Sequence, residues 1–151
     1  MIQRIQTIYL LLSIICLGLV FTFPFATYSI GENAFEFNAF GFNVNGNNQI
    51  KFPFYVSLAL AIGLLVVTLS QFKKRELQMK LGRFNYLIIL VTVALSFINV
   101  RTIVDLFPNL EVQVSYGIGL FMPVAALAFL FLANRAIKND DKLIKSIDRI
   151  R

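Results

Sequence analysis

Hydrophobic and polar positions divide the chain into four long apolar stretches separated by polar segments. The clearest boundary is a short basic segment, residues 73–83, between two stretches that contain no Asp, Glu, Lys, Arg or His, residues 52–72 and 84–100. A helix rises about 1.5 Å per residue, so the first stretch spans roughly 30 Å, the thickness of the hydrocarbon core of a bilayer. The pattern therefore predicts a hairpin of two transmembrane helices around the basic segment.

The same criterion predicts four transmembrane helices in the whole chain, at about residues 7–25, 53–72, 84–104 and 116–134. The first apolar stretch is longer than the roughly 7 to 15 residues of a signal peptide core, and we expect it to be retained. The predicted fold class is an all-α integral membrane protein with a single domain over residues 1–151. It has four transmembrane helices, a small extracytoplasmic β-hairpin or sheet, and a C-terminal cytosolic amphipathic helix.

The predicted extracytoplasmic loop, residues 26–52, has a different pattern. Phenylalanines alternate with small or polar residues at positions 35–44, and the sequence NGNN at 45–48 is typical of a tight turn, which together predict a β-hairpin. The alternating segment 110–114 is predicted to add a strand. An isolated hairpin is marginally stable in water. Its Phe face is therefore either a lid packed on the protein's own helices or a contact surface for a partner.

The third predicted helix carries polar residues at intervals of seven and four, which places them on one face. These residues, which we call the seam, are Asn85, Thr92, Ser96 and Asn99. Two interpretations remain open. The seam either forms interhelical hydrogen bonds inside the bundle or lines a polar path through the membrane.

Arg101 and Asp105 lie at the outer end of the same predicted helix, four residues apart and therefore adjacent on its surface. They are a candidate ion pair at the outer interface, on the face opposite the seam. Arg101 either anchors this helix end by extending towards the headgroup region or pairs with Glu32 or Glu36 of the loop.

The distribution of charge predicts the orientation in the membrane. Of the 14 Lys and Arg residues, all but Lys51 and Arg101 lie in the N-terminal lead, the cytosolic loop 73–83 or the cytosolic tail 135–151. By the positive-inside rule both termini are cytosolic. In the central loop, the topology-determining charges are Lys73, Lys74, Arg75, Lys80 and Arg83. The tail is predicted to form an amphipathic helix that binds either anionic lipid or a cytosolic partner.

Composition narrows the class of function. Hydrophobic residues make up 58% of the chain, against roughly 45 to 50% in soluble domains, so we expect the excess to face the lipid bilayer. Membrane topology accounts for the net charge of +6, and we predict no nucleic-acid binding. The chain has no His and one cysteine, Cys16. We therefore predict no catalytic site, no metal and no cofactor.

The opening sequence MIQRIQTIYLLL and the closing sequence LANRAIKNDDKLIKSIDRIR accompany the four predicted helices and the polar loop after the first. With these features the chain resembles DUF4293, a Bacteroidota family of small four-helix membrane proteins of unknown function. The resemblance implies a bacterial cytoplasmic membrane location. It implies no activity, substrate or catalytic residue.

We expect a non-catalytic accessory or assembly protein of the cytoplasmic membrane, multi-pass, with both termini cytosolic. Its outer hairpin and basic inner surfaces would contact lipid and either a membrane-protein partner or further copies of the chain. The contrast between patterned loops and helices without carboxylates favours this hypothesis. The alternative is a small oligomeric transporter or channel that uses the seam.

Overall fold

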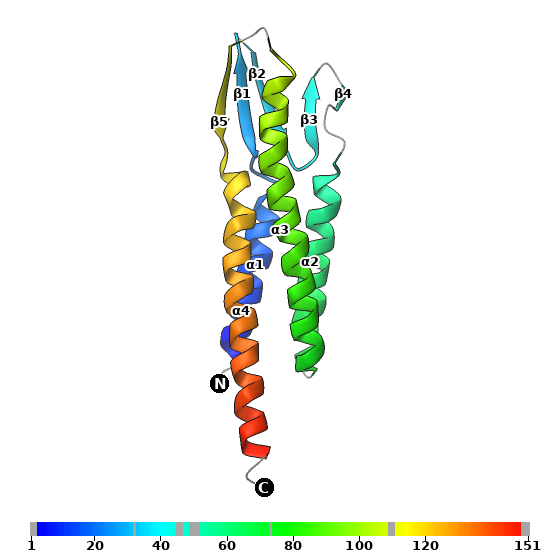
Figure 1. Cartoon of the computed structure of the whole chain (residues 1–151), viewed down its shortest axis with the longest axis vertical. Helices are drawn as coiled ribbons and strands as arrows, with labels where there is room; N and C mark the ends of the chain where they lie inside the picture. Colours follow the sequence, from blue (N-terminus) through cyan, green and yellow to red (C-terminus); the bar gives the residue numbers. More distant parts are fainter. Residues whose placement is uncertain are drawn as a thin grey trace.

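The computed structural model describes residues 3–31, 33–44, 47–48, 52–72, 74–108 and 111–148, which form four helices and five strands. The helices are α1 (Gln3–Leu19), α2 (Phe54–Ser70), α3 (Arg75–Asp105) and α4 (Ile118–Asp148). The strands are β1 (Ala26–Ile30), β2 (Asn33–Asn38), β3 (Gly41–Val44), β4 (Asn47–Asn48) and β5 (Val112–Tyr116). Figure 1 shows the helices side by side, with the strands at one end of the bundle.

The helices run alternately in opposite directions along the bundle (Figure 1). α1 packs mainly against α4, α2 packs against α3, and α3 also packs against α4. The start of α1, the end of α4 and the α2–α3 connection all lie opposite the strands (Figure 1). We call the end with the strands the sheet end and the opposite end the basic end. Among the Lys and Arg residues with described side chains, only Arg101 lies near the sheet, and the others lie at the opposite end.

The five described strands form an antiparallel sheet, so the prediction of an all-α protein is wrong and the fold is mixed. The strand order is β4-β3-β2-β1-β5. The sheet is part of the fold and not an appendage, because Tyr28, Phe37 and Phe42 belong to the same buried hydrophobic core as the helices. The alternation of apolar and polar residues was sufficient to predict strands, but it did not show that the core continues into them.

Strand β5 corresponds to the additional strand that alternation predicted after Pro108. It pairs with β1, so that Val114 lies opposite Tyr28. The turn predicted at residues 45–48 and the return strand predicted after it lie mostly outside the described residues. Among the described ones, Asn47–Asn48 form β4, which pairs with β3.

The prediction of four transmembrane helices is also wrong. Among the described helices, only α3 and α4 are long and apolar enough to cross a membrane. α1 and α2 have 17 residues each, at the lower limit of the roughly 17 to 25 residues that are typical of a transmembrane helix. α1 ends at Leu19 because the chain must turn before Pro24, which has no N–H and disfavours helical geometry at Phe23.

At the basic end, the helix boundaries differ from the predicted loop and tail. α3 begins at Arg75, inside the predicted loop 73–83, and α4 continues without a break through the predicted tail to Asp148. Glu76 lies in the first turn of α3, where a carboxylate interacts favourably with the helix dipole and supports the early start. The side chains beyond Asp141, which include the predicted amphipathic face, lie outside the described residues.

An aromatic cluster joins the sheet to the bundle. Phe25, Phe37 and Phe54 are fully buried, with ring centroids 5.0 to 5.5 Å apart. The Tyr28 hydroxyl donates a hydrogen bond of 2.9 Å to the carbonyl of Val100 on α3. The inward Phe face of the sheet is therefore a lid on the protein's own helices, because these contacts remove its rings from solvent.

A glycine allows the start of α4 to approach the α1–β1 connection closely. The Gly119 N–H donates to the carbonyl of Pro24 at 3.1 Å. A Cβ at Gly119 would overlap the carbonyl oxygens of Phe23 and Pro24. This backbone contact fixes α4 against the chain segment that leads into the sheet.

Candidate functional site

The seam faces α2 in the bundle. Asn85, Thr92 and Ser96 are buried and Asn99 is partly buried. The Asn85 amide donates to the carbonyl of Ala61 at 3.0 Å, and the Thr92 hydroxyl lies 3.2 Å from the Ser57 hydroxyl. Ser96 and Asn99 donate to carbonyls of α3 itself. These hydrogen bonds of the seam therefore lie within the bundle, whereas Oδ1 of Asn85 is buried without a hydrogen-bond partner among the described residues.

Arg101 and Asp105 lie on the exposed side of α3, close to the sheet. Together with Val114 and Tyr116 they line a hollow of about 400 Å³. Glu32, one of the two partners suggested for Arg101, lies outside the described residues. An ion pair between groups as exposed as these contributes little to stability, and we do not take this hollow as the candidate site.

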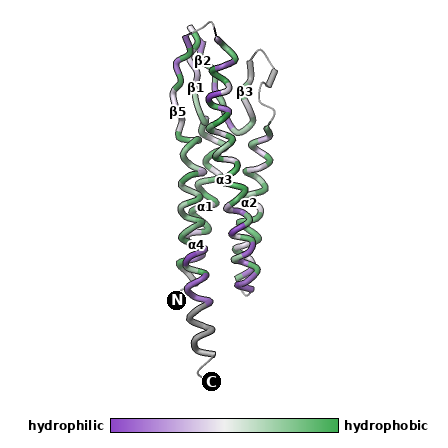
Figure 2. Tube along the Cα trace, in the orientation of Figure 1, coloured by the Kyte–Doolittle hydropathy of each residue, from purple (hydrophilic) through white to green (hydrophobic). Residues whose placement is uncertain are grey.

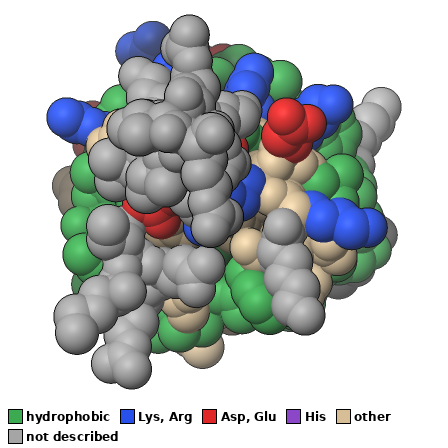
Figure 3. Space-filling model, turned by 90° about the horizontal axis from the view of Figure 1, so that it is seen from below, with side chains coloured by type: hydrophobic (Ala, Val, Ile, Leu, Met, Phe, Trp, Pro, Cys, Tyr) green, Lys and Arg blue, Asp and Glu red, His purple; other side chains and the backbone are tan. Residues whose placement is uncertain are grey.

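The charges that predict the topology gather at the basic end. Figure 3 views the molecule from this side and shows Lys and Arg side chains around its rim. Lys74, Lys80 and Arg83 are exposed, whereas Arg75 is partly buried; Lys73 lies outside the described residues. Nη1 of Arg75 is buried without a hydrogen-bond partner among the described residues.

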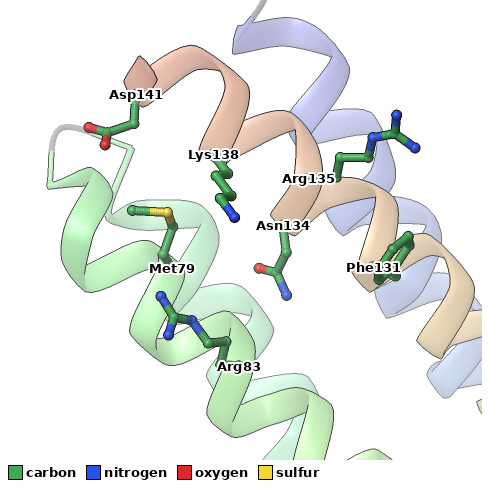
Figure 4. A pocket seen from close by; sticks show the side chains of 7 residues that line it. All are labelled: Met79, Arg83, Phe131, Asn134, Arg135, Lys138 and Asp141. Carbon is green, nitrogen blue, oxygen red and sulfur yellow. The ribbon is translucent and has the colours of Figure 1, made fainter. Parts of the chain in front are cut away.

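A larger hollow, of about 620 Å³, lies between α3 and α4 at the basic end. It is lined by Met79, Arg83, Phe131, Asn134, Arg135, Lys138 and Asp141. In Figure 4, Lys138 of α4 extends towards the space between the two helices, whereas Arg83 lies along α3 in the direction of Met79. Asn134 points into this space, whereas Arg135 extends away from it. The site is therefore built from two helices, and their packing sets its shape.

The spacing of residues along α4 accounts for its side of the hollow. Phe131, Asn134, Lys138 and Asp141 follow one another at intervals of three and four residues and so share one helix face. This signal is present in the sequence. The predicted fourth transmembrane helix ended at residue 134, so two of these residues were assigned to the membrane helix or its end and two to the tail. For this reason the shared face was not recognised from the sequence.

Buried polar groups lie close to this hollow. Gln6 of α1 donates a hydrogen bond through Nε2 to Oδ2 of Asp140, and both side chains are buried. The other carboxylate oxygen of Asp140, and Oδ1 of Asn134, are buried without a hydrogen-bond partner among the described residues. A Cβ at Gly82 of α3 would overlap Oδ1 of Asn134, so this glycine leaves the space that the amide occupies.

The hollow is suited to binding an anion. Its lining carries three cationic groups, Arg83, Arg135 and Lys138, and one carboxylate, Asp141, a net charge of +2. Guanidinium and ammonium groups donate charge-assisted hydrogen bonds to phosphate and carboxylate oxygens. In the part of the chain that the structure describes, no three His, Cys, Asp or Glu residues form a group that could hold a metal ion.

The fold and the site define a helical bundle that carries an antiparallel sheet at one end and a basic hollow at the other. The family described as Domain of unknown function (DUF4293) matches residues 2–150, nearly the whole chain, and the chain belongs to this family. The resemblance seen in the sequence is thereby confirmed. Comparison with curated proteins and with solved structures finds no match.

Proposed function

We propose that the protein is a non-catalytic accessory or assembly protein of the bacterial cytoplasmic membrane. The observation that carries this proposal is the apolar outer surface of the long helices. Only 28% of the most apolar window of α3 and 39% of that of α4 are buried within the protein. The core helix of a soluble protein would be mostly buried, so these surfaces favour contact with acyl chains.

The distribution of side chains along the bundle agrees with this placement. Figure 2 shows hydrophobic residues along the middle of the helices and hydrophilic residues towards the basic end. On α3 and α4 the exposed large hydrophobic residues include Phe84, Leu87, Leu90, Val91, Phe97, Ile98, Phe121, Val124, Phe131 and Leu132. In the proposed arrangement α3 and α4 cross the membrane, and the outward apolar side chains of α1 and α2 also contact lipid.

The orientation follows from the basic end. The α2–α3 connection and both ends of the described chain lie there together (Figure 1), and so do the exposed Lys74, Lys80 and Arg83. By the positive-inside rule this end is cytosolic and the sheet end is extracytoplasmic.

An accessory role is favoured over transport by the contacts of the seam. The transport hypothesis requires seam side chains that offer hydrogen bonds to a passing ion or solute. Asn85, Thr92 and Ser96 are instead buried within the bundle, where their donors bond to α2 or to carbonyls of α3. We therefore propose no transport function.

Membrane placement is tested first. After Cys16→Ser, a single cysteine is introduced at Gln113, exposed on β5, or at Lys80, exposed near the start of α3. We expect extraction by detergent but not by alkaline carbonate. A membrane-impermeant maleimide should label Gln113→Cys in intact cells and Lys80→Cys only after disruption. Carbonate extraction of the protein, or the reverse labelling pattern, would contradict the proposal.

The accessory role is tested by photocrosslinking in cells. Photoreactive residues are placed at the exposed Glu36 and Lys80, with the buried Tyr28 as a matched position that should capture only this chain. We expect one protein partner, captured in constant stoichiometry from at least one exposed position. Crosslinks restricted to lipid and to the chain itself would contradict an accessory role while leaving membrane placement intact.

A further inference from the structure

We propose that the hollow between α3 and α4 binds the phosphate headgroup of a net-anionic glycerophospholipid. The inference rests on the proposed function, because membrane placement brings the basic end to the headgroup region. The volume of about 620 Å³ lies within the range of about 300 to 1,000 Å³ that is typical of small-molecule sites.

The cationic side chains supply the donors that a phosphodiester requires. Arg83 of α3 and Lys138 of α4 line the same hollow from two facing helices. A guanidinium can bind two phosphate oxygens through parallel N–H donors, and an ammonium adds a compact positive charge. Without Arg135, which extends away from the space, Arg83, Lys138 and Asp141 still leave a net charge of +1, which favours a headgroup with a net negative charge over a zwitterionic one.

Asn134 does not contribute to this selectivity. Its Oδ1 is buried against Gly82 of α3, so a headgroup in the hollow does not reach that oxygen. The preference among headgroups therefore rests on charge, which favours a net-anionic headgroup such as that of phosphatidylglycerol over the zwitterionic headgroup of phosphatidylcholine.

The hollow also lies at the border of the apolar surface. Phe131 lines it and is 57% exposed, and the neighbouring Leu132 is 37% exposed. Acyl chains attached to a headgroup in the hollow can extend along these side chains of α4. Basic pockets between membrane helices on the cytosolic side are known to take anionic lipid headgroups, and the proposed orientation puts this hollow on that side.

The test measures lipid binding to the purified full-length protein in nonionic detergent by native mass spectrometry. Phosphatidylglycerol is compared with phosphatidylcholine for the wild type and for Arg83→Gln/Lys138→Gln. The matched control, Lys74→Gln/Lys80→Gln, removes the same charge from exposed positions outside the hollow. We expect a preference for phosphatidylglycerol that falls about tenfold or more in the first variant only. Equal binding by both double variants overturns the proposal.

A second comparison tests whether the phosphodiester charge is the recognised feature. Phosphatidylmethanol carries that charge without a headgroup hydroxyl, so the wild type should bind it about as well as phosphatidylglycerol, and Arg83→Gln/Lys138→Gln should weaken both. Binding of phosphatidylmethanol as weak as that of phosphatidylcholine would overturn the assignment of the phosphate to the hollow.

Soluble phosphates identify the source of the ligand. Inorganic phosphate and glycerol 3-phosphate are offered to the protein loaded with phosphatidylglycerol. We expect neither to displace the lipid. Displacement that depends on Arg83 and Lys138 would assign the hollow to a soluble phosphate ester and overturn the lipid assignment. Carbonate extraction of each variant distinguishes failure of lipid binding from failure of membrane placement. A protein that stays in the membrane but shows no lipid preference refutes the lipid site and leaves the proposed function intact.

Discussion

The sheet end and the basic end differ in how completely their buried polar groups are satisfied. At the sheet end the buried Tyr28 hydroxyl bonds to a carbonyl of α3, and aromatic rings fill the space beneath the strands. At the basic end, Nη1 of Arg75, Oδ1 of Asn134 and Oδ1 of Asp140 are buried without partners among the described residues. Each such group costs about 1–3 kcal/mol. The comparison indicates that packing within the chain satisfies the buried polar groups of the sheet end more completely than those of the basic end.

The largest expected effect is at the sheet end. Phe37→Ala removes a fully buried ring that contacts Phe25 and Phe54, and we expect the free energy of unfolding to fall by about 3–5 kcal/mol. Denaturant or thermal unfolding in detergent measures the loss, and Glu36→Ala, exposed on the same strand, is the control. If phosphatidylglycerol restored the stability of Phe37→Ala, the sheet end would also depend on a ligand, and the proposed difference between the two ends would be wrong.

Gly119→Ala should have the next largest effect. The added Cβ overlaps the backbone carbonyls of Phe23 and Pro24, which cannot move without displacing the start of β1. We expect a loss of about 1–3 kcal/mol in the free energy of unfolding. Gly63→Ala on α2 is the control, because no atom lies within 4 Å of its added Cβ. Equal stability of the two variants would show that the contact at Gly119 is not tight.

Gly82→Ala provides the matching comparison at the basic end. Here the obstacle is the end of the Asn134 side chain, which can rotate away. Replacing a helical glycine with alanine is favourable by about 0.5–1 kcal/mol, so the same unfolding measurement should show little net change. If Gly82→Ala lost as much stability as Gly119→Ala, packing at the basic end would be as tight as at the sheet end, contrary to this prediction.

The smallest expected effect is that of Tyr28→Phe, which removes the hydrogen bond to Val100 and should cost about 0.5–1.5 kcal/mol. Burial, and secondarily the charge of Tyr116, raise the pKa of Tyr28 above its ordinary value of 10.0. The folded protein therefore keeps this proton at a pH where the unfolded chain loses it. Its contribution to stability is complete below the ordinary pKa and declines as the pH rises above it.

Unfolding measured across the alkaline range checks this dependence. The decline in stability should be smaller in Tyr28→Phe than in the wild type, and Tyr55→Phe, at an exposed ring, should behave like the wild type. Parallel declines in wild type and Tyr28→Phe would show that another group titrates.

Local periodicity predicted the elements that repeat over a few residues. The alternation of apolar and polar residues predicted the strand that corresponds to β5. The interval of seven residues predicted that Asn85 and Thr92 share one face of α3. The partners of that face, Ala61 and Ser57 on α2, could not be predicted, because spacing fixes a direction and not the neighbour it meets.

The parts that sequence patterns missed depend on distant segments. Gln6 and Asp140 are 134 positions apart and form one buried contact. The space that Gly82 leaves for Asn134 likewise exists only once α3 and α4 are packed. The number of helices able to cross a membrane was overestimated, because apolar residues continue past the end of α1 into the turn and into β1.

The position of β1 between β2 and β5 sets the order in which the chain can assemble during synthesis. Its neighbour β2 follows almost immediately, but its other neighbour, β5, begins only at Val112. α1 likewise packs against α4, the last helix to be made, with Ser13 donating a hydrogen bond to the carbonyl of Ala126. Closing such distant pairs is slow. The α2–α3 hairpin can therefore form first, whereas α1 and β1 complete their packing only after α4 and β5 have been synthesised.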